Sequence, residues 1–195
     1  MSSHSLPTFR FTDGACIAQT QVSPPPPVTL DSAALSVMTD LTEVRAAAIS
    51  ADLSLAQAEQ AMIHHGVRML FVMDRTPCVD GIVTLDMLHG DKPIKIVQER
   101  HVRRTDLSVA DVMSKLSELD VLDLAAIARA TVRDVAAVLQ SFGMRHLLVA
   151  EAAGPRGPAR ICGVISHTQV ERQLDAPLPA LPVARTFAEI ELALA

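Results

Sequence analysis

The stretch that decides the fold is GVRMLFV at residues 66–72, because it returns later in the chain as GMRHLLV at residues 143–149. Two flanking stretches also return, in the same order: VMT at 37–39 as VMS at 112–114, and GIVT at 81–84 as GVIS at 163–166. Matches that keep their order at a nearly constant spacing indicate a repeated structural unit. The chain is therefore expected to fold as two copies of one unit.

The spacing between the copies is not quite constant. It is wider between Gly81 and Gly163 than between Gly66 and Gly143. The second copy therefore carries an insertion between its second and third matches. The extra residues are GPRGP at 154–158, and glycine and proline together are typical of a loop.

Composition limits the class of protein. The 195 residues are 49% hydrophobic but include no Trp or Tyr and five Phe, which predicts an aliphatic core. No apolar run approaches the roughly 20 residues that span a bilayer, and the N-terminus lacks a signal-peptide pattern. A net charge of −5 argues against a nucleic-acid partner. Three widely spaced cysteines, Cys16, Cys78 and Cys162, favour a reducing compartment, so we expect a cytoplasmic protein. Because no apolar run is long enough to span a bilayer, we expect no membrane partner.

The pattern along the chain divides it into five segments. In order they are an extended N-terminal arm, the first repeat, a solvated connector, the second repeat and a C-terminal tail with a short helix: 1–30, 31–91, 92–108, 109–175 and 176–195. The arm contains four consecutive prolines, Pro24 to Pro27, which keep a chain extended. The helix of the tail is expected to begin at Thr186, and it should dock on the body or on a second subunit.

Local signals predict the elements of the first copy. Ser54 and Gln57 form a capping box, and Gly66 is placed to end the helix that follows. The predicted elements are a short helix at 31–38, a strand at 46–49, a helix at 54–65, strands at 69–73 and 81–85, and a helix at 86–89 that Gly90 and Pro93 end.

The second copy repeats this order. The predicted elements are a strand at 124–127, a helix that residues 131–134 open and Gly143 closes, strands at 146–150 and 161–166, and a helix at 167–174. Each repeat therefore reads strand–helix–strand–strand–helix, which places the protein in the α+β class.

These residues resemble a known family. The VMT start, the Gly-hydrophobic-Arg-x-Leu-x-Val strand and the GIVT strand end are similar to those of the CBS domain, over about residues 34–174. Two copies resemble the tandem CBS pair. The resemblance implies two small three-stranded sheets packed with pseudo-two-fold symmetry, in a stand-alone pair that forms a homodimer. It also implies a non-enzymatic module with no required cofactor, which binds an adenosine-containing ligand (AMP, ADP, ATP or S-adenosylmethionine) between the repeats and signals to a regulated protein.

In this family the corner between the last strand and the last helix reads Gly-x-x-Thr/Ser-x-x-Asp. A hydroxyl beside free N–H groups at a helix start suits a phosphate, and a carboxylate accepts hydrogen bonds from ribose hydroxyls. The first corner, residues 81–87, has Thr84, but its acid, Asp86, stands one position early. The second corner, residues 163–169, has Ser166, and Gln169 replaces the acid.

Further ligand-binding candidates follow from alignment with the family. They would face the base, the ribose or the phosphate: Thr42, Ala47, Val67, Arg68, Met144, Arg145 and His146. Arg68 and Arg145 are the best phosphate candidates, because a guanidinium offers a planar fork of donors. The alternative, that both arginines are exposed and pair with local acids, stays open. Where the first copy has Ala47, the second has the bulkier Leu124.

Other constellations point to no chemistry. His64 and His65 are adjacent on a predicted helix and diverge by about 100°, so we expect no metal site. No base accompanies Cys78, so we expect no enzyme. A second function from another class also remains open. The misplaced Asp86 and the replacement Gln169 favour a ligand-free dimerisation or scaffold protein that keeps the fold but has lost nucleotide binding.

Overall fold

The computed structural model describes residues 27–74, 78–141, 143–154 and 158–178. Most of the expected N-terminal arm and the expected tail helix lie outside these residues. The elements follow in the order η1 (Ala34–Val37), β1 (Thr39–Asp40), β2 (Ala48–Ile49), α1 (Leu55–His65), β3 (Met69–Val72), β4 (Gly81–Thr84), α2 (Leu85–His89), α3 (Asp91–Arg100), η2 (Arg104–Asp106), α4 (Val109–Val112), β5 (Ser114–Lys115), η3 (Leu116–Glu118), β6 (Val121–Asp123), α5 (Leu124–Ile127), α6 (Val132–Ser141), β7 (His146–Glu151), β8 (Arg160–Ser166) and α7 (His167–Leu174).

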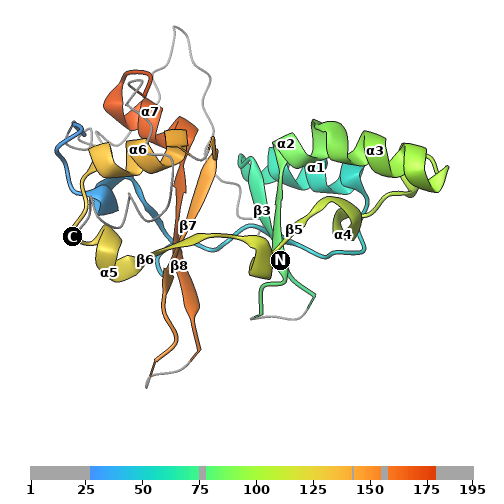
Figure 1. Cartoon of the computed structure of the whole chain (residues 1–195), viewed down its shortest axis with the longest axis horizontal. Helices are drawn as coiled ribbons and strands as arrows, with labels where there is room; N and C mark the ends of the chain where they lie inside the picture. The colour runs from blue at the N-terminus through green and yellow to red at the C-terminus, as the bar shows by residue number, and fades with distance from the viewer. Residues whose placement is uncertain (1–26, 75–77, 142, 155–157, 179–195) are drawn as a thin grey trace, which may run out of the picture.

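Two mixed sheets organise the molecule. One has the strand order β2-β3-β4-β5 and the other β1-β8-β7-β6. In each sheet the first strand of a repeat runs parallel to the next one, and a central antiparallel pair follows. Figure 1 shows α1, α2 and α3 over one half and α5, α6 and α7 over the other, with the two sheets meeting between them. The predicted α+β class and the two-fold repetition are confirmed.

The expectation of three-stranded sheets is wrong, because each repeat contributes one strand to the sheet of the other repeat. β1 pairs with β8, with Thr39 opposite Val164. Its counterpart β5 pairs with β4, with Ser114 opposite Ile82. These two exchanged strands, β1 and β5, begin in the repeated VMT and VMS stretches, so the stretches connect the two copies. Each sheet therefore has four strands.

The repeated glycines Gly81 and Gly163 lie where β4 and β8 pair with the strands from the other repeat, β5 and β1. A Cβ at Gly81 would overlap the backbone carbonyl of Ser114 in β5. A Cβ at Gly163 would overlap the side chain of Met38, next to β1. The close approach of another chain segment therefore explains why both positions lack a side chain.

Helix α1 forms as predicted. The Ser54 hydroxyl accepts a hydrogen bond from the Gln57 N–H, and the Gln57 side chain accepts one from the Ser54 N–H. Gly66 ends the helix in the left-handed conformation at φ 65°. The following strand β3 is buried along its whole length. Arg68 lies in the short connection between this helix and this strand. Because both elements are well defined, they fix the position of its backbone.

Two predicted elements of the repeats are wrong. The predicted strand at 124–127 is the helix α5, because Asp123 accepts a hydrogen bond from the Ala125 N–H and starts a helical turn. The strand lies just before it as β6, parallel to β7. The predicted helix at 31–38 shortens to η1, and Ala33 rather than Asp31 precedes it, with no side-chain cap.

The predicted solvated connector is also wrong. It contains helix α3, whose first turn accommodates Pro93 because the N–H groups there need no partner within the helix. Pro93 and Ile96 are buried. Arg100 pairs with Asp111, and the Arg104 guanidinium donates to the Leu88 carbonyl. The segment is therefore part of the first half of the fold.

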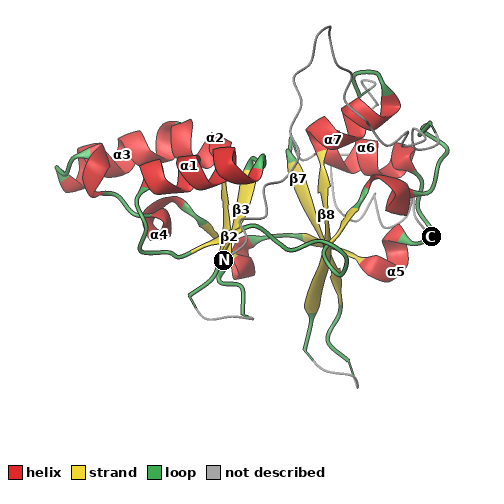
Figure 2. Cartoon of the chain, turned by 180° about the vertical axis from the view of Figure 1, so that it is seen from behind, coloured by secondary structure: helices red, strands yellow, loops and turns green. Residues whose placement is uncertain are grey.

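Three apolar clusters hold the structure. One lies under the helices of each repeat. The third joins the two sheets and contains Met69, Phe71, Ile82 and Leu148. In Figure 2, seen from behind, β3 of one half and the strands β7 and β8 of the other lie on the sides where the two halves face each other. In the part of the chain that the structure describes, no helix is long and apolar enough to cross a bilayer.

Candidate functional site

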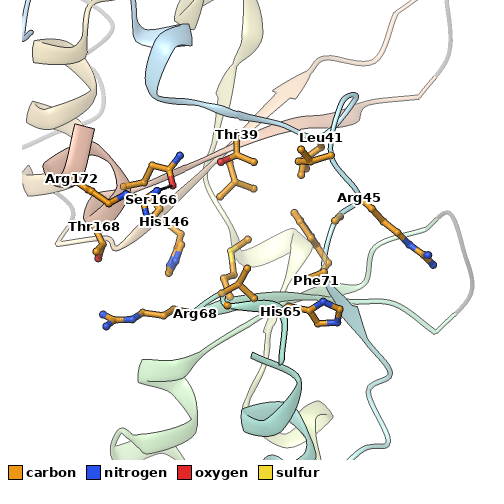
Figure 3. A pocket seen from close by; sticks show the side chains of 18 residues that line it. Thr39, Leu41, Arg45, His65, Arg68, Phe71, His146, Ser166, Thr168 and Arg172 are labelled. Atoms are coloured by element: carbon orange, nitrogen blue, oxygen red, sulfur yellow. Dashed lines mark hydrogen bonds between the residues drawn. The ribbon is translucent and has the colours of Figure 1, made fainter. Parts of the chain in front are cut away.

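A cleft of about 380 Å³ opens between the two repeats. We call it the inter-repeat cleft. Its lining comes from the segment around β1, from the α1–β3 connection and from the β8–α7 corner: Thr39, Leu41, Val44, Arg45, Ala46, Ala47, His65, Gly66, Val67, Arg68, Met69, Phe71, His146, Val164, Ser166, Thr168, Gln169 and Arg172. Figure 3 shows these side chains converging from the two halves.

The middle of the cleft is apolar. Met69 and Phe71 belong to the cluster between the sheets, and Leu41 packs against the same cluster. Ala47 stands directly before β2, and its small side chain leaves room in the cleft. The surface can therefore pack against the face of a flat aromatic ring.

The second corner forms the polar wall. Ser166 ends β8 and precedes α7, but its side chain makes no capping hydrogen bond to that helix. Its hydroxyl therefore remains available at the start of the helix, where the backbone favours anions. One turn further on, the Arg172 guanidinium donates to Oε1 of Gln169 at 3.2 Å, which holds both side chains on the same wall.

The charged side chains of the cleft are basic. Three arginines, Arg45, Arg68 and Arg172, line it together with two histidines, and no Asp or Glu is among its lining residues in the described chain. In Figure 3, Arg68 from the first repeat and Arg172 from the second lie on one side of the cleft. Arg45 lies on the other side. The cleft is thus suited to an anionic ligand.

His146 lies on the same side of the cleft as Arg68 and Arg172 (Figure 3). Burial lowers the pKa of His146 below its ordinary value, and the nearby Arg145 and Arg68 lower it further, while Asp86 acts in the opposite direction. The ring is therefore neutral near pH 7 and adds no positive charge to the cleft there.

Six of the predicted site residues line the cleft: Ala47, Val67, Arg68, His146, Ser166 and Gln169. Five do not: Thr42, Thr84, Asp86, Met144 and Arg145. The hydroxyl of Thr42 donates to Asp40 at 2.7 Å, within its own turn. The hydroxyl of Thr84 accepts from the Met87 N–H and caps α2.

Asp86 and Arg145 pair with each other. Oδ2 of Asp86 lies 2.8 Å from Nε of Arg145, and the pair joins the first corner to the second repeat. The open alternative was that both arginines are exposed and pair with local acids. Arg145 is exposed and pairs with an acid, but this acid is distant in sequence. Arg68 forms no ion pair within the described residues, so the two equivalent arginines differ.

Several lining residues were not indicated by the sequence, among them Leu41, Arg45, His65, Thr168 and Arg172. Arg172 follows Gln169 by three residues on α7, so helical spacing could have indicated it. Arg45 and His65 face the cleft only because β2 and β3 are adjacent, and no local signal reveals this. Among the described residues, no three His, Cys, Asp or Glu side chains gather as metal ligands.

Comparison with known proteins identifies the architecture. No protein-family model and no curated protein matches the sequence. Among solved structures, the chain is similar to CBSX2 from Arabidopsis thaliana in complex with AMP, with 19% identity, a TM-score of 0.51, and coverage of 72% of this chain and 94% of that one. An uncharacterised conserved protein from Pyrococcus horikoshii gives 16% identity and a TM-score of 0.54, covering 79% of this chain and 100% of that one.

A CBS-domain-containing protein from Agrobacterium tumefaciens gives 21% identity and a TM-score of 0.50, covering 68% of this chain and 88% of that one. At these identities the likeness concerns the fold. It agrees with the repeated unit and with the two mixed sheets. The chain has the fold of a tandem CBS-domain pair.

Proposed function

We propose that this protein is a non-enzymatic regulatory module that binds an adenosine-containing ligand in the inter-repeat cleft and signals to a partner protein. The observation that carries the proposal is the cleft itself, which has an apolar middle, a polar corner and contributions from both repeats. The AMP complex of CBSX2, a protein of similar fold, supports this class of ligand. We further propose that the protein acts as a homodimer in the cytoplasm.

Each part of the ligand has a matching part of the cleft. The base would lie among the apolar side chains beside Ala47. The amide of Gln169 would hydrogen-bond a ribose hydroxyl, and the Ser166 hydroxyl with Arg68 would hold phosphate. Because the ligand would touch both repeats, its binding would favour one arrangement of the two halves, to the extent that it binds that arrangement better.

The test is calorimetric titration with AMP, ADP, ATP and S-adenosylmethionine. Ala47→Leu should abolish binding, because a larger side chain fills the space beside the apolar middle. Ala48→Leu is the matched control, because Ala48 is exposed and lies outside the cleft. Unfolding temperatures of both variants check that they fold. If none of the four compounds binds the native chain, the proposal fails.

The alternative is a ligand-free dimerisation or scaffold protein. One observation favours it: no carboxylate lines the cleft in the described chain, so a ribose has no charged acceptor there. This alternative predicts a stable dimer in sedimentation experiments and no heat of binding with any of the four compounds.

A further inference from the structure

We propose that the inter-repeat cleft selects a nucleotide carrying two or more phosphates, rejects the cationic sulfonium of S-adenosylmethionine, and is the only one of two related positions that takes an anion. This inference rests on the proposed function and adds the chemical class of the ligand. The two positions are the inter-repeat cleft, at the second corner, and the matching place at the first corner.

The repeat makes the two positions directly comparable. Arg68 and Arg145 are equivalent, because each stands third in its copy of the repeated seven-residue stretch, directly before β3 or β7. Asp86 and Thr168 are equivalent, because each stands two positions after the hydroxyl residue of its corner. Each of these arginines lies near the corner of the other repeat: Arg145 contacts the acid Asp86, and Arg68 lines the cleft together with the hydroxyl residue Thr168.

Because of this single difference, the first position offers a ligand a neutralised arginine and the second offers a positively charged one. At the first corner, Asp86 lies 2.8 Å from Arg145 and neutralises it. At the second corner, Thr168 cannot neutralise Arg68, and Arg68 has no ion-pair partner among the residues that the structure describes. An anion that approached Arg145 would have to displace an internal carboxylate, whereas an anion that approached Arg68 would displace only water.

The second corner also adds charge. Arg172 comes from α7 and lies on the same side of the cleft as Arg68, with Thr168 and His146 nearby (Figure 3). Two guanidinium groups from opposite repeats can each bind a different phosphate group of the same nucleotide. A single phosphate would engage them less fully, and a sulfonium would meet repulsion from both.

The apolar side chains fix the direction in which the ligand would lie. Leu41 and Phe71 lie away from the Arg68 side in Figure 3. A base placed beside them would point its phosphates toward Arg68 and Arg172. The ligand would then bridge the repeats through its phosphate chain.

The test is calorimetric titration with ATP, AMP, adenosine and S-adenosylmethionine at low and high salt, with inorganic tripolyphosphate as competitor. We expect one ATP per chain, bound at least tenfold more tightly than AMP or S-adenosylmethionine. The preference should shrink as salt rises, because screening weakens exposed charge interactions. Tripolyphosphate should displace ATP.

Arg68→Ala should lower the affinity for ATP at least tenfold and leave that for adenosine unchanged. Arg129→Ala is the control, because Arg129 is exposed and lies outside the cleft. Binding of S-adenosylmethionine as tight as that of ATP, or binding of ATP that is independent of salt, would overturn this inference while leaving the proposed function standing. If no adenosyl compound binds, the proposed function fails and the nucleotide assignment fails with it.

Discussion

The two strand-to-helix corners are copies of one motif, but their polar groups have different partners. At the first corner, Thr84 caps α2 and Asp86 pairs with Arg145, so its polar groups are satisfied within the protein. At the second corner, the Ser166 side chain does not cap α7, and Arg68 has no acidic partner within the described residues. The first corner therefore stabilises the fold, whereas the polar groups of the second corner are less engaged within the protein. Equivalent residues of a duplicated chain can thus differ in whether the protein itself supplies their partner.

The largest expected effect concerns the glycines that begin the two corners. Gly81→Ala should cost roughly 3 kcal/mol of stability, because the new methyl meets the rigid backbone of Ser114. Gly163→Ala should cost about 1 kcal/mol, because it meets the flexible side chain of Met38. Chemical denaturation measures both values. Equal costs would contradict the distinction between a backbone and a side-chain neighbour.

Exchanging the corner residues should come next in size. Thr168→Asp should place a carboxylate opposite Arg68 and weaken ATP binding at least tenfold, or about 1.4 kcal/mol. Asp86→Thr should free Arg145 and create a second, weaker site for tripolyphosphate, which calorimetric stoichiometry would detect. An unchanged ATP affinity in Thr168→Asp would show that the charge of Arg68 does not matter to the ligand.

Removing the two hydroxyls separates their roles. Thr84→Ala should cost about 1 kcal/mol of stability, because it deletes the cap of α2, and should leave ligand affinity unchanged. Ser166→Ala should change stability by less than about 0.5 kcal/mol, because no cap is lost, but should weaken nucleotide binding. Thermal unfolding with and without ATP measures both effects. The reverse pattern would mean that the two corners have been assigned the wrong way round.

The smallest expected effect is on pH dependence. Because burial lowers the pKa of His146 in the folded protein, the unfolded chain takes up this proton more readily. The contribution of His146 to stability is therefore complete above the ordinary pKa of 6.5 and is lost as pH falls below it. His146→Gln should flatten the fall in stability between neutral and mildly acidic pH. His64→Gln, at an exposed position on α1, is the control for the removal of a histidine. A slope that His146→Gln leaves unchanged would contradict the expectation.

Elements with a local signal were predictable. The Ser54–Gln57 box and Gly66 bound α1 as expected, and the helix 167–174 has the predicted ends. The prediction of a strand at 124–127 was wrong because an Ala-rich apolar run suits either a buried strand or a helix. Asp123 favours the helix through its hydrogen bond with the Ala125 N–H. The connector was predicted wrongly because three buried side chains, Pro93, Ile96 and Leu107, lie among its charged residues.

The candidate site was predictable only in part. The motif resemblance correctly predicted that the second corner and Arg68 line the cleft. It gave no reason to distinguish the second corner from the first. Nothing within a few residues of Arg145 indicates its partner, since Asp86 is far away in the sequence and meets it only across the interface between the repeats. Arg45 and His65 were missed for a different reason, because they reach the cleft through the pairing of β2 with β3 within the first repeat.

The sequence by itself determined the duplication, the helix ends and the residue types available at each corner, because these depend on matches along the chain and on hydrogen bonds that span a few residues. Only the tertiary structure decided that each repeat lends a strand to the other, and which of two equivalent arginines is neutralised. Both outcomes depend on how the two halves dock. Docking brings together residues that are distant in sequence, and only there do their shapes and charges meet.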